Sequence, residues 1–408
     1  MASGDKAEPI QELDRVLPSG IDRRKFLQST AAAVAAIGAA GCTDDADGTD
    51  GTGETDGTDT ADGTDENGGV GQITWRQPWV VEPTWAFAYV AEDDGYWDDM
   101  DFDPPEVQSG DGSPDTARRV GTNENTVGTA EITSVIGGWA GGQESLVFGA
   151  TKQWSLLALM WPSDGDVEDQ TDLEGHHVLL SSPFAEDTWP IIPAAFDLDP
   201  DEISTEFADE DIAPALAGGA DAVYGSIDTV LSLERGLEGE GREGEMEMYP
   251  VNNHYDIIGN PLLVSREWYE SHDDADDVLA GVLEGYSEAV KWVSLNPDEA
   301  IDMLEEREPE VGAQERDELE DQMVWGITLT TGGGAHEEGL GYLDDEAMAA
   351  SIDVLADAAT DSPEDVPDPD DVILTEPTEN ADLATFDDDE WAEVEEYISH
   401  RLQVFEGE

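Results

Sequence analysis

Basic residues and cysteine are scarce in this sequence. Lysine and arginine together number 16, against 99 aspartates and glutamates, so the formal net charge is −83 over 408 residues. A surface of that charge repels phosphate groups, which excludes an ordinary nucleic-acid-binding protein. The one cysteine, Cys42, excludes a disulfide within the chain and any zinc or iron–sulfur site that needs several cysteines.

Apolar residues, by contrast, are not scarce. They make up 38% of the chain, and counted with glycine and without tyrosine they reach about 46%, as in globular domains. A sizeable core is therefore expected, with the acidic residues on its surface. Lysine occurs only at Lys6, Lys25, Lys152 and Lys291. Such a surface resembles adaptation to molar salt, where charges are screened within about 3 Å. A generic acidic protein is the alternative.

The N-terminal region has the pattern of an export signal. Residues 22–27 read Asp-Arg-Arg-Lys-Phe-Leu, and an apolar run covers 31–40. A twin arginine before a short apolar stretch is typical of a twin-arginine secretory signal, here 1–41. The stretch 26–41 is too short for a membrane span and is interrupted by Gln28, Ser29 and Thr30. An amphipathic helix is the alternative. The ending Ala-Ala-Gly-Cys resembles a lipobox, so Cys42 is expected to carry the lipid of the mature protein.

The next segment, 42–71, repeats aspartate, glycine and threonine and has no aliphatic side chain larger than alanine before Val70. It cannot bury enough apolar surface to offset its ordering entropy, so we expect a disordered acidic tether. A globular body then begins near Gln72.

Apolar runs and amphipathic stretches alternate along the body. The runs predict strands over 73–79, 126–129, 145–150, 154–161, 177–181, 220–225 and 262–265. Helices are expected over 83–90, 114–120, 131–139, 277–295, from 296, and over 344–358. This alternation favours an α/β body with largely parallel sheets.

Sequence motifs of common enzyme classes are missing. The chain has no P-loop, no dinucleotide fingerprint, no Gly-x-Ser-x-Gly and no His-Glu-x-x-His. His176 and His177 are adjacent and would point to opposite faces of a strand, so they cannot grip one metal. We therefore predict no catalytic residues, no metal and no cofactor.

Several short motifs occur in the order seen in one family. They are Gly95-Tyr96-Trp97, Asp172-Leu173-Glu174-Gly175, Gly219-Ala220-Asp221-Ala222 and Asn296-Pro297-Asp298-Glu299-Ala300. Over roughly 73–357 the chain resembles the substrate-binding proteins of ABC importers, in the branch with sulfonate, nitrate, taurine and thiamine-pyrimidine binders.

This resemblance implies a two-lobed periplasmic-binding-protein type II fold with the ligand in the cleft between α/β lobes. Lobe one would be 73–153 plus 263–358, and lobe two 154–262. Residues 359–408 would form an acidic C-terminal extension with one helix. The implied protein is a lipid-anchored, extracytoplasmic receptor that closes on a small ligand by hinge motion and docks on an ABC permease with its ATPase.

Two other functions stay open. One is an enzyme that makes a pyrimidine or pyridine precursor on the same fold, although the chain lacks the Cys-rich motif of such relatives. The other is a surface protein that senses or adheres. For a receptor, a sulfonate or nitrate site needs a cation or a helix N-terminus, and lobe two has only Arg235 and Arg242. A neutral or cationic heteroaromatic ligand, similar to the thiamine pyrimidine, is favoured by six tryptophans near predicted strand ends or the following loops: Trp75, Trp79, Trp85, Trp139, Trp154 and Trp189.

The carboxyl ends of the predicted strands indicate where the ligand would bind, because open α/β sheets bind ligands at that edge. Tryptophans there could stack on a ring, and carboxylates could accept its amino hydrogens; core packing and surface charge are the alternative roles. The candidate ligand-binding residues are Gln77, Trp79, Trp85, Glu131, Ser134, Ser182, Trp189, Tyr224, Ser226 and Asp228.

Overall fold

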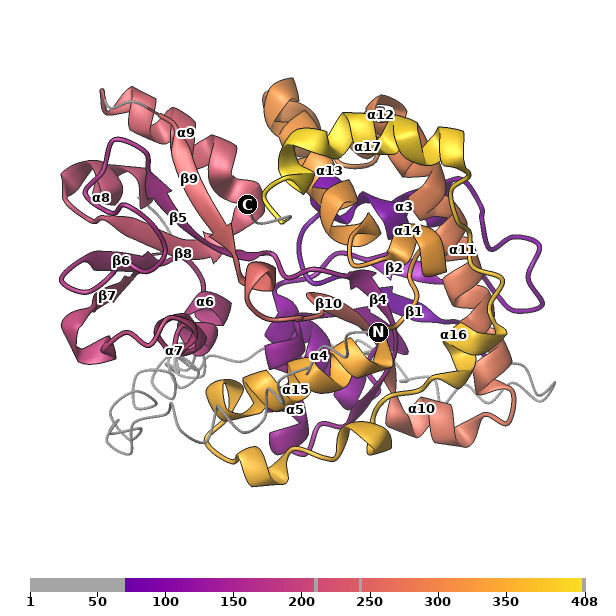
Figure 1. Cartoon of the computed structure of the whole chain (residues 1–408). Helices are drawn as coiled ribbons and strands as arrows, with labels where there is room; N and C mark the ends of the chain where they lie inside the picture. The colour runs from indigo at the N-terminus through magenta and orange to yellow at the C-terminus, as the bar shows by residue number, and fades with distance from the viewer. Residues whose placement is uncertain (1–69, 209–211, 242–243, 406–408) are drawn as a thin grey trace, which may run out of the picture. The chain divides into compact units, whose positions relative to one another are not determined.

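The computed structural model describes residues 70–208, 212–241 and 244–405 (Figure 1). The expected export signal, Cys42 and all of the expected tether except Val70 and Gly71 lie outside these residues. Within the described ranges, no helix is long and apolar enough to cross a membrane. The same ranges contain no group of three or more His, Cys, Asp or Glu side chains that could hold a metal ion.

Within the described residues, ten strands form two sheets of five. The first sheet has the order β2 (Glu106–Gln108), β1 (Thr74–Arg76), β3 (Val127–Thr129), β10 (Asn260–Ser265), β4 (Ser145–Lys152). The second has the order β7 (Ser204–Phe207), β6 (His177–Leu180), β8 (Ala222–Ser226), β5 (Leu157–Pro162), β9 (Met246–Pro250). Strands β4, β5 and β10 are buried along their whole length, which explains their apolar character without alternation.

The prediction of largely parallel sheets is wrong. Strand β10 runs antiparallel to both β3 and β4, and β5 runs antiparallel to both β8 and β9. The reason is that both strands enter from the other sheet. The chain passes from β4 to β5 through 153–156, the first crossover, and from β9 to β10 through 251–259, the second crossover. Neither connection contains the long helical return that parallel neighbours need.

Helices cover both sheets (Figure 1). The first sheet is accompanied by eleven of the described helices: α3 (Ala86–Asp93), α4 (Ser113–Gly121), α5 (Ile132–Ala140), α10 (Arg266–Ser271), α11 (Ala275–Leu295), α12 (Pro297–Arg307), α13 (Arg316–Thr331), α14 (Ala335–Glu338), α15 (Asp345–Ala359), α16 (Glu376–Asn380) and α17 (Asp388–Leu402). The second sheet is accompanied by α6 (Pro183–Thr188), α7 (Ile191–Ala195), α8 (Ile212–Gly218) and α9 (Val230–Gly239). Short 3-10 turns include η1 (Pro83–Trp85), η3 (Ile227–Thr229) and η4 (Val251–Asn253). We call each sheet with its helices a lobe.

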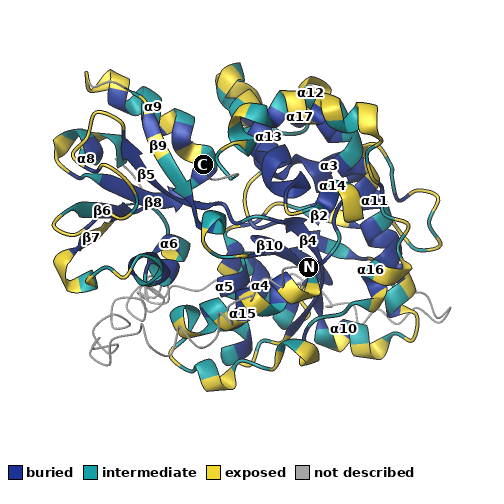
Figure 2. Ribbon diagram, viewed as in Figure 1, coloured by how far each residue is buried: buried dark blue, intermediate teal, exposed yellow. Residues whose placement is uncertain are grey.

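The strands of the first sheet are mostly buried (Figure 2), and the interior of the first lobe is rich in aromatic rings. Trp75, Trp97 and Tyr286 are fully buried, and the Trp75 ring centroid lies 5.9 Å from that of Trp97 and 5.5 Å from that of Tyr286. The indole of Trp75 donates a 3.1 Å hydrogen bond to Thr129 Oγ1, and that of Trp97 donates one of 3.1 Å to the carbonyl of Val282. Their N–H groups are therefore satisfied in the core, where these rings serve packing.

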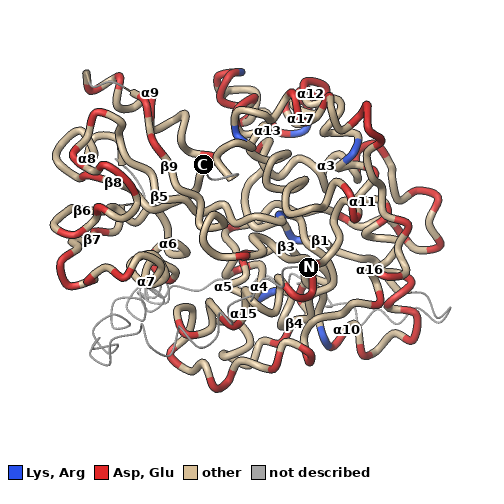
Figure 3. Tube along the Cα trace, viewed as in Figure 1, with Lys and Arg blue, Asp and Glu red and all other residues tan. Residues whose placement is uncertain are grey.

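The aspartates and glutamates of the described residues are exposed or partly buried, as expected, and Figure 3 shows them spread along the described chain. Among the described residues, no aspartate or glutamate belongs to the buried class, whereas one lysine, Lys152, does. Basic side chains on the surface face several carboxylates at once. Arg316, for example, has four acidic side chains within 4 Å: Asp298, Asp302, Glu305 and Glu320. The excess acid therefore faces solvent, where salt screens it.

The C-terminal segment adds more structure than the one expected helix. Both α16 and α17 form, and they pack against helices of the first lobe. Ahead of them the chain pairs with the edge strand β4, since Leu374 donates its N–H to the carbonyl of Val147 at 2.8 Å. Val394 and Ile398 of α17 are fully buried. These apolar positions attach the segment to the first lobe.

Candidate functional site

The two lobes meet along two sets of helices. On one side α5 of the first lobe packs on α6 of the second, and on the other side η1 and α13 face η3 and α9. Thr84 in η1 donates a hydrogen bond of 3.1 Å to Asp228 in η3. Arg235 in α9 pairs with Glu318 of α13 at 2.6 Å and also with Asp317. These polar contacts join the lobes, and the first of them lies among residues that the sequence selected.

Asp228 is at the centre of this junction. It follows strand β8, and Ser226 at the end of that strand donates a 2.5 Å hydrogen bond to its other carboxylate oxygen. Burial raises the pKa of Asp228, while the hydrogen bonds from Ser226 and Thr84 and the charge of Lys152 act in the opposite direction. Burial has the largest effect, so this carboxyl group holds its proton more strongly than an exposed aspartate.

A second carboxyl group faces Asp228 from the first lobe. Glu82 directly precedes η1, and burial raises its pKa to about 8, with repulsion by Asp228 adding to the shift. A hydrogen bond from the Trp85 side chain and the charge of Lys152 oppose it. Glu82 and Asp228 therefore compete for the same compensating positive charge.

Two more carboxyl groups approach from the other side of the junction. Glu131 directly precedes α5, and burial raises its pKa to about 7; a hydrogen bond from Ser113 opposes the shift, and repulsion by Asp228 and Asp187 adds to it. Asp187 is in α6 of the second lobe, and burial together with Glu186 raises its pKa to about 6. We call Glu82, Glu131, Asp187 and Asp228 the inter-lobe carboxylates. Each keeps some solvent exposure.

Lys152 lies beneath this group, at the end of β4. Its ammonium donates to the carbonyl of Thr84 at 2.6 Å, to Thr330 Oγ1 at 3.0 Å and to the carbonyl of Gly326 at 3.3 Å. It also lies 5.0 Å and 4.6 Å from the ring centroids of Trp85 and Phe87. Burial lowers the pKa of Lys152 to about 7, against the attraction of Asp228 and Glu82. This cation supports η1 from the inside and is sealed from solvent.

The structure brings four of the sequence-predicted residues to the junction. They are Trp85, Glu131, Ser226 and Asp228. Ser134 follows Glu131 by one turn and is partly buried; its N–H donates to the Glu131 carbonyl at 3.0 Å. Gln77 is buried beside α4, where its carbonyl accepts from Thr116 at 2.8 Å. Its Nε2 has no hydrogen-bond partner among the described residues.

The other four predicted residues have different surroundings. Trp189 is buried and packs edge-on against Tyr224, with ring centroids 5.7 Å apart, and the hydroxyl of Tyr224 lies 3.2 Å from Thr188 Oγ1. Both rings belong to the interior of the second lobe. Ser182 caps α6 by accepting from the N–H of Ala185 at 3.0 Å. Trp79 is 49% exposed on a turn.

Sequence reasoning missed Glu82, Asp187, Thr84 and Lys152. The two acids had no distinguishing signal among 99 carboxylates. Lys152 did have one, because it is one of four lysines and follows the apolar run 145–150 after a single residue, Thr151. A lysine at the end of a buried strand is unusual enough to mark a buried cation with acceptors around it.

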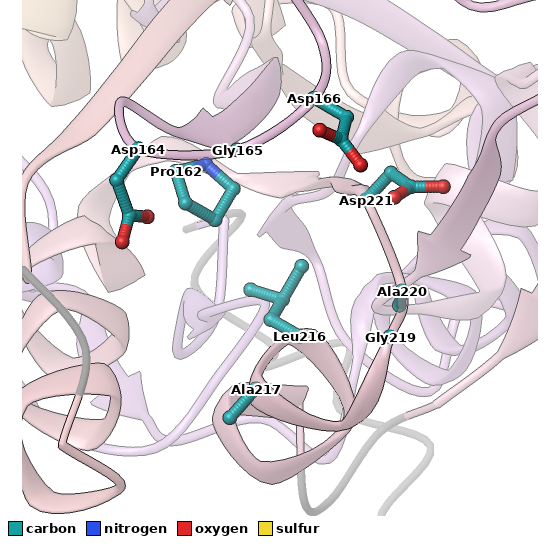
Figure 4. Close-up of a pocket in the computed structure, with 9 residues that line it drawn as sticks. All are labelled: Pro162, Asp164, Gly165, Asp166, Leu216, Ala217, Gly219, Ala220 and Asp221. Carbon is teal, nitrogen blue, oxygen red and sulfur yellow. The ribbon is translucent and has the colours of Figure 1, made fainter.

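A separate hollow lies in the second lobe (Figure 4). Its volume is about 250 Å³. It is lined by Pro162, Asp164, Gly165, Asp166, Leu216, Ala217, Gly219, Ala220 and Asp221. Asp221 is already engaged, since it accepts from the N–H of His177 at 2.8 Å. None of the residues predicted for the ligand site lines this hollow, so it is distinct from the inter-lobe junction.

Solved structures with the same architecture define the fold. The periplasmic aliphatic sulphonate binding protein SsuA of Escherichia coli has a TM-score of 0.56 at 12% identity, covering 78% of this chain and 93% of its own. The periplasmic nitrate-binding protein NrtA of Synechocystis PCC 6803 has 0.53 at 12%, covering 82% and 91%. The Candida albicans CA3427 gene product, described as having the generic periplasmic binding protein fold, has 0.52 at 13%, covering 78% and 99%. The two-lobed α/β fold expected from the sequence is confirmed.

A family model places the chain more narrowly. The model described as NMT1/THI5 like matches residues 82–300, more than half of the chain. The protein belongs to this family, as the motifs predicted. No curated protein sequence matches the chain. The family match begins at Glu82 and includes all four inter-lobe carboxylates, whereas α13 to α17 lie beyond it.

Proposed function

We propose that this protein is the extracytoplasmic solute-binding component of an ABC importer and holds its ligand among the inter-lobe carboxylates. Family membership and the fold shared with periplasmic binding proteins support this role. The observation that carries it is the arrangement around Asp228. Acidic groups of both lobes converge where Thr84 and Asp228 join the lobes, and a receptor that closes on a solute needs contacts from both sides.

The chemistry of the junction favours a ligand that donates hydrogen bonds. The four carboxyl groups offer acceptor oxygens, and burial raises the pKa of Glu82 and Glu131, so a ligand that brings N–H donors or a positive charge would stabilise their ionised forms. A small heteroaromatic ring with amino groups, neutral or cationic and similar to the thiamine pyrimidine, supplies both donors and charge. We propose this ligand class for the site.

An anion of the sulfonate or nitrate type is the alternative, because the E. coli and Synechocystis neighbours bind such anions by name. Near the junction, the two cations of the described residues, Lys152 and Arg235, are already engaged. The ammonium of Lys152 is fully buried among three oxygen acceptors. Arg235 pairs with Glu318 and Asp317. An incoming anion would therefore face carboxylates in place of free cations.

The cellular setting follows from the N-terminal sequence. A twin-arginine signal and a lipidated Cys42 would hold the receptor outside the cell membrane on an acidic tether, within reach of a permease and its ATPase. The body carries no recognised catalytic motif, and we propose a binder in place of a pyrimidine-synthesising enzyme. Acidic surfaces of this kind also fit an environment of molar salt.

The identity of the ligand tests this function. The folded protein is purified in molar salt, and any co-purified small molecule is released and identified by mass spectrometry. Incubation of that molecule with fresh protein must return it unaltered. A heteroaromatic amine returned intact supports the proposal. A bound sulfonate or nitrate contradicts the ligand class, and conversion of the molecule contradicts the receptor role.

A further inference from the structure

The end of the C-terminal segment lies on the hinge. Helix α17 packs against α13 of the first lobe (Figure 1). Beyond its last residue, Leu402, the chain continues to the two crossovers that link the lobes. The Phe405 ring stacks on Trp154 of the first crossover, with ring centroids 4.3 Å apart and planes tilted by 18°. An extension outside the family match thus reaches a segment that links the two lobes.

The second crossover is held by the neighbouring residue. Asn253, the last residue of η4, donates a side-chain hydrogen bond of 2.8 Å to the carbonyl of Val404. The adjacent Asn252 accepts from the N–H of Ser155 in the first crossover at 2.7 Å. Two consecutive C-terminal residues therefore contact both crossovers at a point where the crossovers are also bonded to each other.

The other end of the segment is fixed to the first lobe. Arg401 pairs with Asp321, and its guanidinium lies 4.8 Å from the ring centroid of Trp325; both partners are in α13. The Arg401 and Asp321 side chains are only 15% and 10% exposed, so solvent screens this pair weakly. The Trp154 ring also lies against Gly332 at the end of α13, where a Cβ would come within 2.5 Å of the ring. Little freedom remains for this contact to shift.

We propose that residues 401–405 form a hinge clamp, a built-in segment that ties both crossovers to α13 and favours the arrangement in which the lobes touch. Hinge motion rotates the crossovers relative to the first lobe, so opening must shear the Phe405–Trp154 stack and the Asn253–Val404 bond. The structure holds these contacts together with the inter-lobe bonds Thr84–Asp228 and Arg235–Glu318. The clamp acts on the proposed solute receptor. It depends on that function only in assuming that the lobes move about a hinge.

The test measures the hinge without any ligand, so its result is independent of ligand identity. In the full chain carrying Cys42→Ser, spin labels are attached through Thr205→Cys on β7 and Glu299→Cys on α12, both exposed positions. Electron-spin distance measurements in molar salt then report the lobe separation. Phe405→Ala, and separately a chain that ends at Gln403, should lower the population at the short distance about twofold or more. Asn253→Ala should act in the same direction.

Trp391→Ala is the matched control. This indole also belongs to α17, and its ring contacts are with His336, at 4.0 Å between ring centroids, and with Phe386, both of the first lobe. It should lower the melting temperature and leave the distance distribution unchanged. Unchanged distributions in the Phe405, Asn253 and shortened variants would overturn the clamp. An equal change in Trp391→Ala would overturn it as well, because the effect would then come from general loss of packing.

Discussion

Thr84 is hydrogen-bonded both to the buried ammonium of Lys152 and to the carboxylate of Asp228. Its backbone carbonyl accepts a 2.6 Å hydrogen bond from Lys152, and its hydroxyl donates a 3.1 Å bond to Asp228 of the opposite lobe. The rare lysine thus fixes the turn that carries the inter-lobe contact. Charge inside the first lobe and contact with the second lobe are coupled through this one residue.

The pKa of Glu82 predicts a pH dependence of stability. Its ordinary value of 4.5 rises to about 8 in the folded chain. Between those values the folded chain binds more protons at this site than the unfolded chain, so its contribution to stability falls as the pH rises from 4.5 to about 8. We expect the stability of the natural chain, relative to Glu82→Gln, to decline across that window. Denaturant titrations of both proteins at several pH values measure it, and parallel curves would contradict the raised pKa of Glu82.

Two tryptophans chosen from the sequence should now behave differently. Trp189 is 8% exposed and packs on Tyr224, so Trp189→Ala should destabilise the protein by about 3–5 kcal/mol through the cavity that it leaves. Trp79 is 49% exposed, and Trp79→Ala should leave the melting temperature nearly unchanged. Thermal unfolding compares the pair directly. Equal melting temperatures for the two variants would show that Trp189 does not serve as a packing residue.

Screening by salt should be necessary for the folded state. The formal net charge is −83, so the acidic side chains repel one another. The Debye length, which limits the range of this repulsion, is about 3 Å at 1 M salt and about 10 Å at 0.1 M. Transfer to low salt should therefore lower the melting temperature or unfold the body. Calorimetric scans across this range test it. A melting temperature that does not move would contradict adaptation to high salt.

Lipidation should depend on one side chain. Cys42 is the only cysteine in the chain, so Cys42→Ser should leave the exported protein without a lipid. Cell fractionation and the mass of the N-terminal peptide report this. A variant that remained in the membrane fraction and kept the lipid mass would show that the anchor is elsewhere.

The sequence predicted the elements that have a strong apolar pattern and missed those that lack one. The buried strands β4 and β5 and the amphipathic helix α11 have strong apolar signals and were expected close to their observed ranges. Strand β7 was missed because all four of its residues are exposed and mostly polar. The direction of β5 and β10 could not be predicted, because it depends on the chain passing between two sheets, which no local pattern records.

The site was partly predictable for a similar reason. Asp228 and Glu131 follow strand ends, so the rule that places ligands at carboxyl edges selected them. Glu82 and Asp187 reach the same junction from a turn and a short helix, and nothing in a chain so rich in acid separates them from surface residues. The roles of the tryptophans could not be predicted, because a tryptophan near a strand end can either pack in the core or stack on a ligand.

The affinity of the ligand for an Asp228 variant tests the central claim most directly. Titration calorimetry in molar salt compares the natural chain, Asp228→Asn and the matched control Asp353→Asn, an exposed aspartate on α15, with an aminopyrimidine and with an alkanesulfonate as ligands. We predict that the aminopyrimidine binds, that Asp228→Asn weakens it about tenfold or more, roughly 1.4 kcal/mol, and that Asp353→Asn does not. Unchanged aminopyrimidine affinity in Asp228→Asn, or tight binding of the alkanesulfonate alone, would contradict a ligand site at the inter-lobe carboxylates.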